Sequence, residues 1–155
     1  MKTVFYYDCL ETPTGLLEVT ASSDAVLSVY FVDQPHDVSR NTITSKAIEQ
    51  LTEYFAGQRN CFNLPLGSQG TVFQQKVWQA LTEISYGATC SYGDIANQID
   101  NPKAVRAVGL ANAKNPMTLV VPCHRVIGKN GALTGYAGGV DRKAWLLKHE
   151  GVLLT

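Results

Sequence analysis

The sequence is poor in charge and lacks a long apolar run. Charged residues make up 17% of its 155 residues and apolar residues 45%, a balance typical of a folded globular chain rather than a disordered one. A membrane-spanning helix needs about 18 consecutive apolar residues, and no stretch provides them. The amino terminus also lacks the apolar core of a signal peptide. We therefore expect a cytoplasmic protein with no membrane partner.

Cysteine is sparse and irregularly spaced. The four cysteines, Cys9, Cys61, Cys90 and Cys123, form no C-x-x-C pair. This spacing is typical of neither a disulfide framework nor a zinc site, so we expect reduced thiols and no bound metal.

The chain has no net charge, but its charges are unevenly distributed. Residues 1–68 carry four Lys or Arg and eight Asp or Glu, a net charge of −4, whereas residues 69–155 carry nine and five, a net charge of +4. A basic half suits a polyanion such as DNA, although chance scatter of a few charges would give the same totals.

Residues 1–68 are expected to form a small antiparallel sheet with one helix. Their β-branched and aromatic residues predict strands at 4–7, 16–21 and 26–32, with a candidate further strand at 61–66. Apolar residues at helical spacing predict a helix over 44–56. His36 stands alone in a polar loop, so we expect it to be solvated.

Residues 69–155 are expected to be mostly helical. Thr71 with Gln74 fits a capping box that opens one helix, and Ser91 with Asp94 fits a second. Asp141 is expected to cap the last helix, over residues 142–149.

A third helix, over residues 103–112, completes a helix-turn-helix pattern. Asn101 as N-cap and Pro102 at the first helical position predict its start. Arg106 is the long side chain at its middle, and small residues line the rest: Ala104, Ala107, Gly109 and Ala111. Such a helix can pack closely on a partner helix, with Arg106 in solvent, or enter a narrow DNA groove.

The residues around Cys123 are the strongest candidates for chemistry. Leu119–Val121 is expected to be a short buried strand, which Pro122 ends because it has no N–H to donate. Cys123 then precedes His124 and Arg125, and a thiol near such groups is a candidate low-pKa nucleophile. Because successive side chains of an extended segment point to opposite faces, we expect a water or a third group to connect the thiol with His124. The alternative is a packed core cysteine.

Two features beyond Cys123 also indicate a site. Residues 128–131 have the Asn-Gly signature of a hairpin turn, and the glycine-rich loop 135–139 suits a phosphate or a flat base, although it lacks the lysine of a P-loop. Glu150 follows the last helix, where the helix dipole disfavours a carboxylate. It therefore either has an imidazole partner or faces solvent.

Together these residues resemble the O6-alkylguanine-DNA alkyltransferase family, also called methylated-DNA–protein-cysteine methyltransferases. The resemblance is dense from Phe73 to Gly151 and is centred on Pro122-Cys123-His124-Arg125-Val126. It is supported by the residues 91–93, 101–109, 115–116, 136–139 and 145–151.

The resemblance implies an α+β fold of two domains. Residues 1–68 would form a ribonuclease-H-like domain with an antiparallel sheet and a helix. Residues 69–155 would form a mostly helical, winged-helix-like DNA-binding domain that carries the helix-turn-helix and the active-site cysteine. The implied function is DNA repair by a monomer. It extrudes O6-alkylguanine, and O4-alkylthymine, from double-stranded DNA and transfers the alkyl group irreversibly to Cys123. Each protein repairs one lesion, and no cofactor is needed.

The resemblance also implies roles for individual residues. His124 takes the proton of Cys123 through a water, Glu150 orients His124, and Asn115 orders the site. Arg106 fills the space of the extruded nucleotide while the helix bearing Ala104, Ala107 and Gly109 lies in the minor groove. Further binding positions are Tyr92, which contacts a phosphate and guanine N3, Tyr136 beside the base, the backbone N–H of Ala137 near O6, and Arg125, Val126 and Gly138.

Some positions depart from the family pattern, and two rival functions remain. Ala137 stands where many members have serine, and Ala113 where some carry a basic residue; the zinc ligands of some animal members are not recognisable. A Cys-His thiol hydrolase would need an oxyanion loop before Cys123. A non-catalytic alkyltransferase-like lesion binder belongs to a class that replaces this cysteine.

Overall fold

The computed structural model describes residues 4–154, which form two compact units. The first comprises the described chain up to Gln69 together with Pro116–Val120, and the second comprises Gly70–Asn115 and the described chain from Val121 onward. Among the described residues, no helix combines the length and apolar character needed to cross a membrane.

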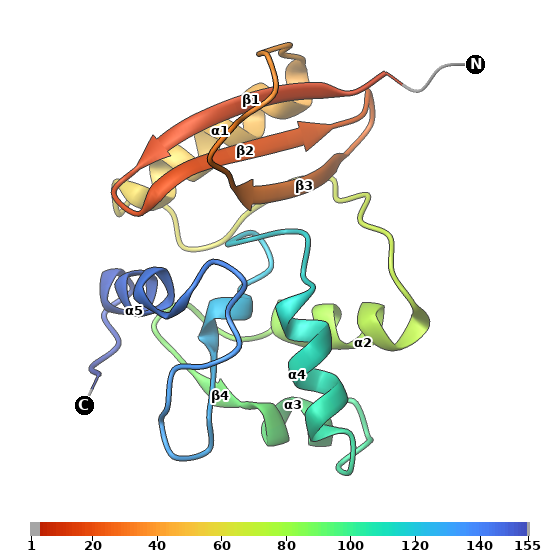
Figure 1. Cartoon of the computed structure of the whole chain (residues 1–155), viewed down its shortest axis with the longest axis vertical. Coiled ribbons are helices and arrows are strands. Elements are labelled where there is room, and N and C mark those ends of the chain that lie inside the picture. The colour runs from red at the N-terminus through yellow and green to blue at the C-terminus, as the bar shows by residue number, and fades with distance from the viewer. Residues whose placement is uncertain (1–3, 155) are drawn as a thin grey trace. The chain divides into compact units, whose positions relative to one another are not determined.

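The first unit is a three-stranded antiparallel sheet with a helix on one face, as the sequence predicts (Figure 1). β1 (Tyr6–Thr12), β2 (Gly15–Ala21) and β3 (Val26–Phe31) pair in that order, and α1 (Thr42–Phe55) packs against them. β1 is longer than predicted because each of its residues has a partner on β2.

Apolar side chains of the sheet and of α1 form the core of this unit. Leu17 and Val19 of β2 and Leu51 of α1 have no exposed surface. The Asn41 side chain accepts a hydrogen bond from the Thr44 backbone (2.9 Å), and the Thr44 hydroxyl accepts one from the Asn41 backbone (3.0 Å). This capping box fixes the start of α1 two residues before the predicted position.

His36 is exposed, as predicted, but it does not stand alone. Its ring stacks on Tyr7 with 4.1 Å between ring centroids, and its Nδ1 lies 3.0 Å from Oε1 of Glu18. Its backbone N–H also donates to Glu18 Oε2 at 2.6 Å. These contacts tie the loop to the sheet.

The candidate strand at 61–66 does not form. Leu66 makes only an isolated bridge with Val26, whose N–H donates to the Pro65 carbonyl at 2.8 Å. Because Pro65 has no N–H to donate, it interrupts a continuous ladder of backbone hydrogen bonds with β3.

Residues 116–120 pack within the first unit, although they precede Cys123. The Val29 N–H donates to the Pro116 carbonyl at 2.8 Å. Leu119 has a positive φ of 71°, which is uncommon for a residue with a Cβ atom, so the chain turns there. The predicted buried strand Leu119–Val121 is therefore wrong.

The second unit is mostly helical. Its elements are α2 (Val72–Leu81), β4 (Cys90–Ser91), α3 (Tyr92–Gln98), α4 (Val105–Ala113), the 3-10 helix η1 (Cys123–Arg125), β5 (Val126–Ile127) and α5 (Val140–His149). α2, α3 and α4 pack on one another (Figure 1), and α3, the turn after it and α4 form the predicted helix-turn-helix. Val77, Ile95, Val108 and Leu146 are buried.

Both predicted capping boxes of this unit are confirmed. Thr71 Oγ1 accepts from the Gln74 backbone at 3.0 Å and Gln74 Oε1 from the Thr71 backbone at 3.0 Å. Ser91 Oγ accepts from the Asp94 backbone at 3.0 Å and Asp94 Oδ2 from the Ser91 backbone at 2.9 Å. The second box opens α3 directly beside Tyr92.

The predicted start of the next helix is wrong. α4 begins at Val105, and Ala104 is its N-cap without a side-chain hydrogen bond. The Ala104 N–H donates to the Asn101 carbonyl at 3.0 Å, so residues 101–104 close a separate turn.

The predicted cap of α5 and the predicted hairpin at residues 128–131 are also wrong. α5 follows Gly139, whose φ of 92° suits glycine, and Asp141 lies in the first turn without capping it. The turn at residues 128–131 closes with a Gly131 N–H to Gly128 carbonyl bond of 2.8 Å. It does not join a hairpin, because β5 pairs in parallel with β4.

Candidate functional site

Cys123 opens the 3-10 helix η1 and is 5% exposed. The turn is closed by a hydrogen bond from the Arg125 N–H to the Pro122 carbonyl (3.0 Å). Asn115 supports it from the preceding segment, because its Nδ2 donates to the Val121 carbonyl at 2.8 Å. A tight turn, rather than the predicted strand end, therefore positions the thiol.

Cys123 does not have the lowered thiol pKa that the sequence suggested. Burial raises its pKa, and this effect outweighs a hydrogen bond from Asn115, the charge of Lys143 and nearby backbone N–H groups, all of which lower it. The resting side chain is a neutral thiol, and its activation requires a base.

His124 meets the requirements of that base. It is fully buried, and its Nε2 lies 2.8 Å from Oε2 of Glu150. The predicted imidazole partner of Glu150 is thus confirmed. A carboxylate at Nε2 favours the tautomer with its proton on that nitrogen, which leaves Nδ1 as an acceptor. Nδ1 is buried and has no hydrogen-bond partner among the described residues.

The imidazole is neutral at neutral pH. Burial lowers the pKa of His124, against the hydrogen bond and charge of Glu150, which raise it; Arg125 and Lys143 lower it further. A buried neutral imidazole with an open acceptor nitrogen can receive a proton.

Arg125, which the resemblance places among the DNA-binding residues, makes its hydrogen bonds inside the protein in this structure. Its Nε donates to Glu150 Oε1 at 2.8 Å and one terminal nitrogen to Glu150 Oε2 at 3.1 Å. The other terminal nitrogen donates to the Ile84 carbonyl at 2.6 Å, and the residue is 6% exposed. Arg125 therefore neutralises and fixes Glu150.

The predicted base-binding residues lie on two segments of the same unit. Tyr136 is buried at the start of the glycine-rich loop, and its hydroxyl has no hydrogen-bond partner among the described residues. Ala137 is exposed, and the half-buried Gly138 accepts from Arg142 at 3.2 Å. Val126 is fully buried in β5.

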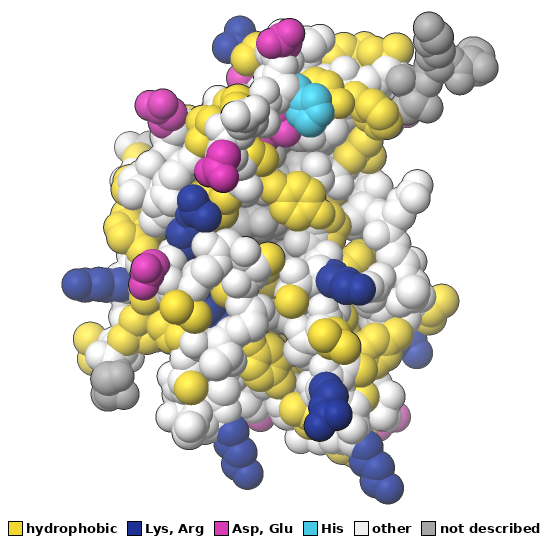
Figure 2. Space-filling model, in the orientation of Figure 1, with side chains coloured by type: hydrophobic (Ala, Val, Ile, Leu, Met, Phe, Trp, Pro, Cys, Tyr) yellow, Lys and Arg dark blue, Asp and Glu magenta, His cyan; other side chains and the backbone are white. Residues whose placement is uncertain are grey.

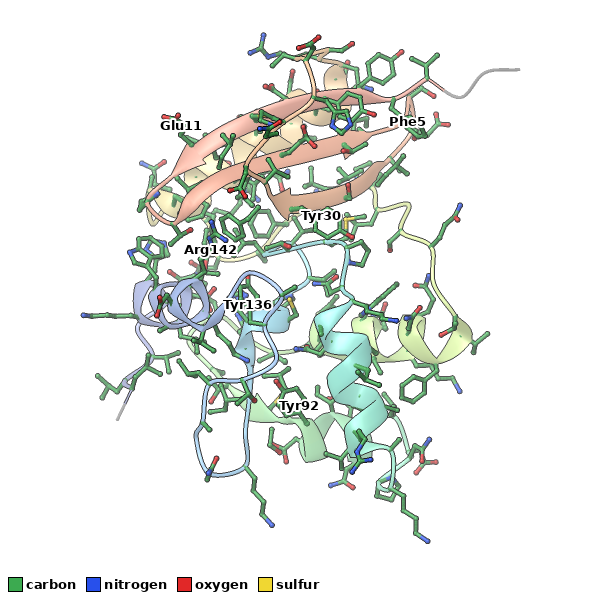
Figure 3. The ribbon with its side chains drawn as sticks, viewed as in Figure 1. Phe5, Glu11, Tyr30, Tyr92, Tyr136 and Arg142 are labelled. Atoms are coloured by element: carbon green, nitrogen blue, oxygen red, sulfur yellow. The ribbon has the colours of Figure 1, made fainter. Side chains whose placement is uncertain are left out.

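Tyr92 is also close to this loop. Its hydroxyl donates to the Thr134 carbonyl at 2.9 Å, and a Cβ atom on Gly135 would lie 2.7 Å from that hydroxyl. Tyr92, at the start of α3, lies beside the segment that leads from η1 to α5, and Tyr136 belongs to that segment (Figure 3). In the free protein, the Tyr92 hydroxyl is therefore occupied by a hydrogen bond within the chain.

α4 presents at its surface three of the four small residues that the sequence singles out, whereas Ala111 is buried. Arg106 and Ala107 are exposed and Ala104 and Gly109 partly so. Leu110, which the sequence analysis did not single out, lies one turn beyond Arg106 and is 62% exposed.

The second unit has the more basic surface, consistent with the charge distribution of the sequence. On the face shown in Figure 2, Lys and Arg side chains extend from the second unit, and most of the visible acidic side chains lie on the first. This surface suits a polyanion.

Sequence reasoning missed two buried polar residues near Cys123. Asn112 of α4 donates from Nδ2 to the Cys123 carbonyl at 3.3 Å, and its Oδ1 has no hydrogen-bond partner among the described residues. Lys143 of α5 is fully buried and donates to the Thr134 carbonyl at 2.6 Å. Polar residues at buried positions of helices are the signal that could have identified both.

The other cysteines lack such surroundings. Cys90 is half-buried, and burial together with the charge of Asp94 raises its pKa to about 11. Cys61 is exposed and Cys9 partly buried, and all four thiols are free. Within residues 4–154 there is also no group of three His, Cys, Asp or Glu side chains placed to hold a metal ion.

Comparison with known proteins gives two family matches that together span most of the chain. Residues 72–152 match the 6-O-methylguanine DNA methyltransferase, DNA binding domain, and residues 5–67 match the ribonuclease-like domain of the same family.

Similar proteins of known name agree with these matches. The constitutive methylated-DNA–protein-cysteine methyltransferase of Bacillus subtilis is 47% identical over 94% of this chain and 94% of its own length. A protein of the same name from Mycolicibacterium paratuberculosis is 48% identical over 93% and 91%. The O6-methylguanine methyltransferase structure of Mycobacterium tuberculosis has a TM-score of 0.87 at 43% identity, covering 95% of this chain and 93% of that one. The Mycobacterium tuberculosis OGT structure in complex with DNA has a TM-score of 0.86 at 44% identity, covering 94% and 92%.

Proposed function

Because the chain belongs to the 6-O-methylguanine DNA methyltransferase family, we propose that it binds DNA and repairs it by moving an alkyl group from guanine O6 to Cys123. The observation that carries the proposal is the hydrogen-bonded His124–Glu150 pair directly after a buried thiol, with Nδ1 of His124 left open as an acceptor. That pair supplies the base that the raised pKa of the thiol requires.

In the proposed reaction, a water passes the thiol proton of Cys123 to Nδ1 of His124. The thiolate attacks the alkyl carbon in line as the carbon–O6 bond breaks, and guanine leaves with the electron pair and takes up the proton. Glu150 stabilises the imidazolium, and Asn115 holds the turn that carries the thiol. The product thioether has no carbonyl for water to attack, so each protein acts once.

The target O6 lies inside the base stack, so we propose that the nucleotide is flipped out through the minor groove. Flipping costs a few kcal/mol and less for a weakened pair, and Arg106, exposed on α4, would fill the gap. Ala104, Ala107 and Gly109 allow α4 to approach the groove closely. O4-alkylthymine would present the same kind of alkyl oxygen.

The extruded base would lie against Tyr136, with the backbone N–H of Ala137 near O6 and the loop at Gly138 and Val126 around it. Tyr92 would donate to guanine N3. For this, its hydroxyl must leave the Thr134 carbonyl, which it binds in the free protein.

All of the residues in this proposal come from one chain, so a monomer suffices. A reactive thiol also needs a reducing compartment, and the four free cysteines are compatible with a cytoplasmic protein.

The proposal is tested by incubating the protein with a duplex oligonucleotide that contains O6-methylguanine and measuring the intact mass. We expect one added methyl group, located on the Cys123 peptide, and no further turnover. Cys123→Ser should abolish transfer and keep DNA binding, whereas Cys61→Ser, which removes an exposed thiol, should transfer normally. Repeated turnover would indicate a thiol hydrolase, and tight lesion binding without transfer would indicate a non-catalytic binder.

A further inference from the structure

Asn112 is a buried side-chain amide that the proposed reaction leaves unused. It lies in the last turn of α4, where it is 1% exposed and follows the buried Ala111. Its Nδ2 donates to the Cys123 carbonyl at 3.3 Å. Its Oδ1 is buried and has no hydrogen-bond partner among the described residues. Because an unsatisfied buried acceptor costs free energy, this amide is less favourable there than an apolar side chain of the same shape.

A second buried amide shows the arrangement that favours stability. Gln50 of α1 is 4% exposed, and both of its polar groups bind the backbone of Asn63. Its Nε2 donates to the Asn63 carbonyl and its Oε1 accepts from the Asn63 N–H, each at 2.9 Å. Asn112 makes one longer bond, to the Cys123 carbonyl, which also accepts from the Val126 N–H. The free energy of folding therefore does not explain the amide of Asn112.

The hydrogen bond of Asn112 joins the helix that is proposed to displace the nucleotide with the turn that carries the thiol. Arg106 is exposed on α4, and Cys123 is the first residue of η1. The end of α4 is itself fixed, because Trp78 Nε1 donates to the Ala111 carbonyl at 2.9 Å. A bond from Asn112 therefore holds the backbone of the nucleophile against a fixed helix.

Asn115 holds the same stretch of backbone from the segment that follows α4. Its Nδ2 donates to the Val121 carbonyl at 2.8 Å. The carbonyls of Val121 and Cys123, on the two sides of Pro122, are thus each bound by a side-chain amide. The two amides together fix the backbone around Pro122 relative to the end of α4.

Building on the proposed alkyl transfer, we propose that Asn112 is a positioning residue, which ties the backbone of Cys123 to α4 so that a nucleotide displaced by Arg106 reaches the sulfur in line. Such an attack needs the sulfur about 3–3.5 Å from the alkyl carbon, and a misplacement of about 1 Å can cost about 100-fold in rate. In this proposal Asn112 touches neither the substrate nor the transferred proton, so it leaves the chemical step itself unchanged. A free base is not delivered by α4 and reaches the thiol without this link.

The first experiment measures single-turnover methyl transfer from a saturating duplex that contains O6-methylguanine and from the free O6-methylguanine base. Asn112→Leu should slow transfer from the duplex roughly 10-fold or more and keep transfer from the free base within about threefold of the wild-type rate. Gln50→Met is the matched control, because it also removes a buried amide, and it should leave both rates unchanged. The affinity for the duplex should be the same in all three proteins, since Asn112 and Gln50 are buried.

Three results would overturn the proposal in a wild type that repairs DNA. An unchanged duplex rate in Asn112→Leu would show that the link has no role. An equal loss with the duplex and the free base would place Asn112 in the activation of the thiol, and weaker DNA binding would place it in the folding of α4. A wild type that transfers no methyl group at all would instead refute the proposed function.

Urea unfolding followed by circular dichroism separates positioning from a structural role without any DNA. Asn112→Leu exchanges the amide for an apolar side chain of similar shape and removes the unsatisfied acceptor, so its urea midpoint should stay close to that of the wild type or rise. Gln50→Met should lower the midpoint, because it leaves the N–H and the carbonyl of Asn63 without these partners. An equal fall in Asn112→Leu would show that Asn112 serves stability and would overturn the proposal.

Asn112→Asp tests the donated hydrogen bond and does not depend on how a leucine packs. A protonated carboxyl can donate to the Cys123 carbonyl, whereas an ionised one only accepts. A buried carboxyl keeps its proton in acid and loses it as pH rises, because burial disfavours the charged form. Transfer from the duplex by Asn112→Asp should therefore exceed that by Asn112→Leu at pH 5.5, and the advantage should disappear by pH 9. Equal rates of the two variants at pH 5.5 would show that the donor has no role and would overturn the proposal.

Discussion

Three hydrogen bonds from two neighbouring residues converge on Glu150, which is 4% exposed. One comes from His124 and two from Arg125. A carboxylate at the end of α5 would otherwise be unfavourable near the negative pole of the helix dipole. These bonds offset that cost and set the imidazole tautomer that leaves Nδ1 open.

Glu150→Gln should therefore reduce both activity and stability. A glutamine amide can donate to Nε2 of His124, which would place the imidazole proton on Nδ1 and remove the acceptor. We expect alkyl transfer to slow roughly 100-fold or more, and the free energy of unfolding to fall by about 3 kcal/mol because Arg125 keeps a buried charge without its partner. Single-turnover transfer and urea unfolding measure the two effects.

Glu53→Gln is the control for that experiment. Glu53 also pairs with an arginine, Arg59, at 2.9 Å, but both side chains are partly exposed. Its removal should cost about 1 kcal/mol or less and leave transfer unchanged. Transfer by Glu150→Gln within threefold of the wild-type rate would show that Nδ1 is not the base.

The resemblance implied His124 as the partner of Glu150, and the two are hydrogen-bonded. The contacts of Arg125 with the same carboxylate were not predicted. A carboxylate at a helix C-terminus is a local anomaly that is visible in the sequence, and the imidazole is its natural partner. The direction of the Arg125 side chain depends on the η1 turn and on the Ile84 carbonyl, 41 residues away in the chain. No local pattern specifies such a contact.

The starting points of the helices show the same difference between features set by neighbouring residues and features set by residues far apart in the sequence. The capping boxes at Thr71 and Ser91 could be predicted because each involves residues three positions apart. The start of α4 could not be predicted, because Asn101 closes its own turn. Pro116, which precedes Cys123 in the chain, pairs with Val29 of β3, which is distant in the sequence.

The role of α4 as a whole can be tested by removing its long central side chain. Arg106→Ala should slow repair of O6-methylguanine in duplex DNA by roughly 10-fold or more, because nothing then offsets the few kcal/mol of base flipping. Reaction with a free O6-alkylguanine base should change little, since no flipping is needed. Both rates are measured by mass spectrometry under single-turnover conditions.

Lys46→Ala, which removes an exposed cation from α1 of the first unit, is the matched control and should leave both rates unchanged. An equal loss of both rates in Arg106→Ala would place Arg106 in the chemistry or the folding of the site rather than in flipping.

Over the whole molecule, the two units differ in the kinds of side chain that they bury. The first unit combines an apolar core of sheet and helix with two buried carboxylates, Asp8 and Glu18. The second buries His124, Arg125, Lys143 and Glu150, four side chains that ordinarily carry charge or can do so. The stability of the second unit should accordingly depend on pH through His124 and Lys143, whose pKa values are both lowered by burial.

Acid should destabilise the second unit through the protonation of His124. The folded-state pKa of His124 lies below its usual value of 6.5, so the unfolded chain binds a proton there that the folded unit does not. Stability is therefore fully present above about pH 6.5 and decreases as pH falls below it, by up to about 1.4 kcal/mol per pH unit. Trp78 and Trp145 are the only tryptophans of the chain and both belong to this unit, so urea unfolding followed by tryptophan fluorescence reports on it alone. His124→Gln should lose this slope between pH 6.5 and 5 whatever its absolute stability, and an unaltered slope would mean that the imidazole is already protonated in the folded protein.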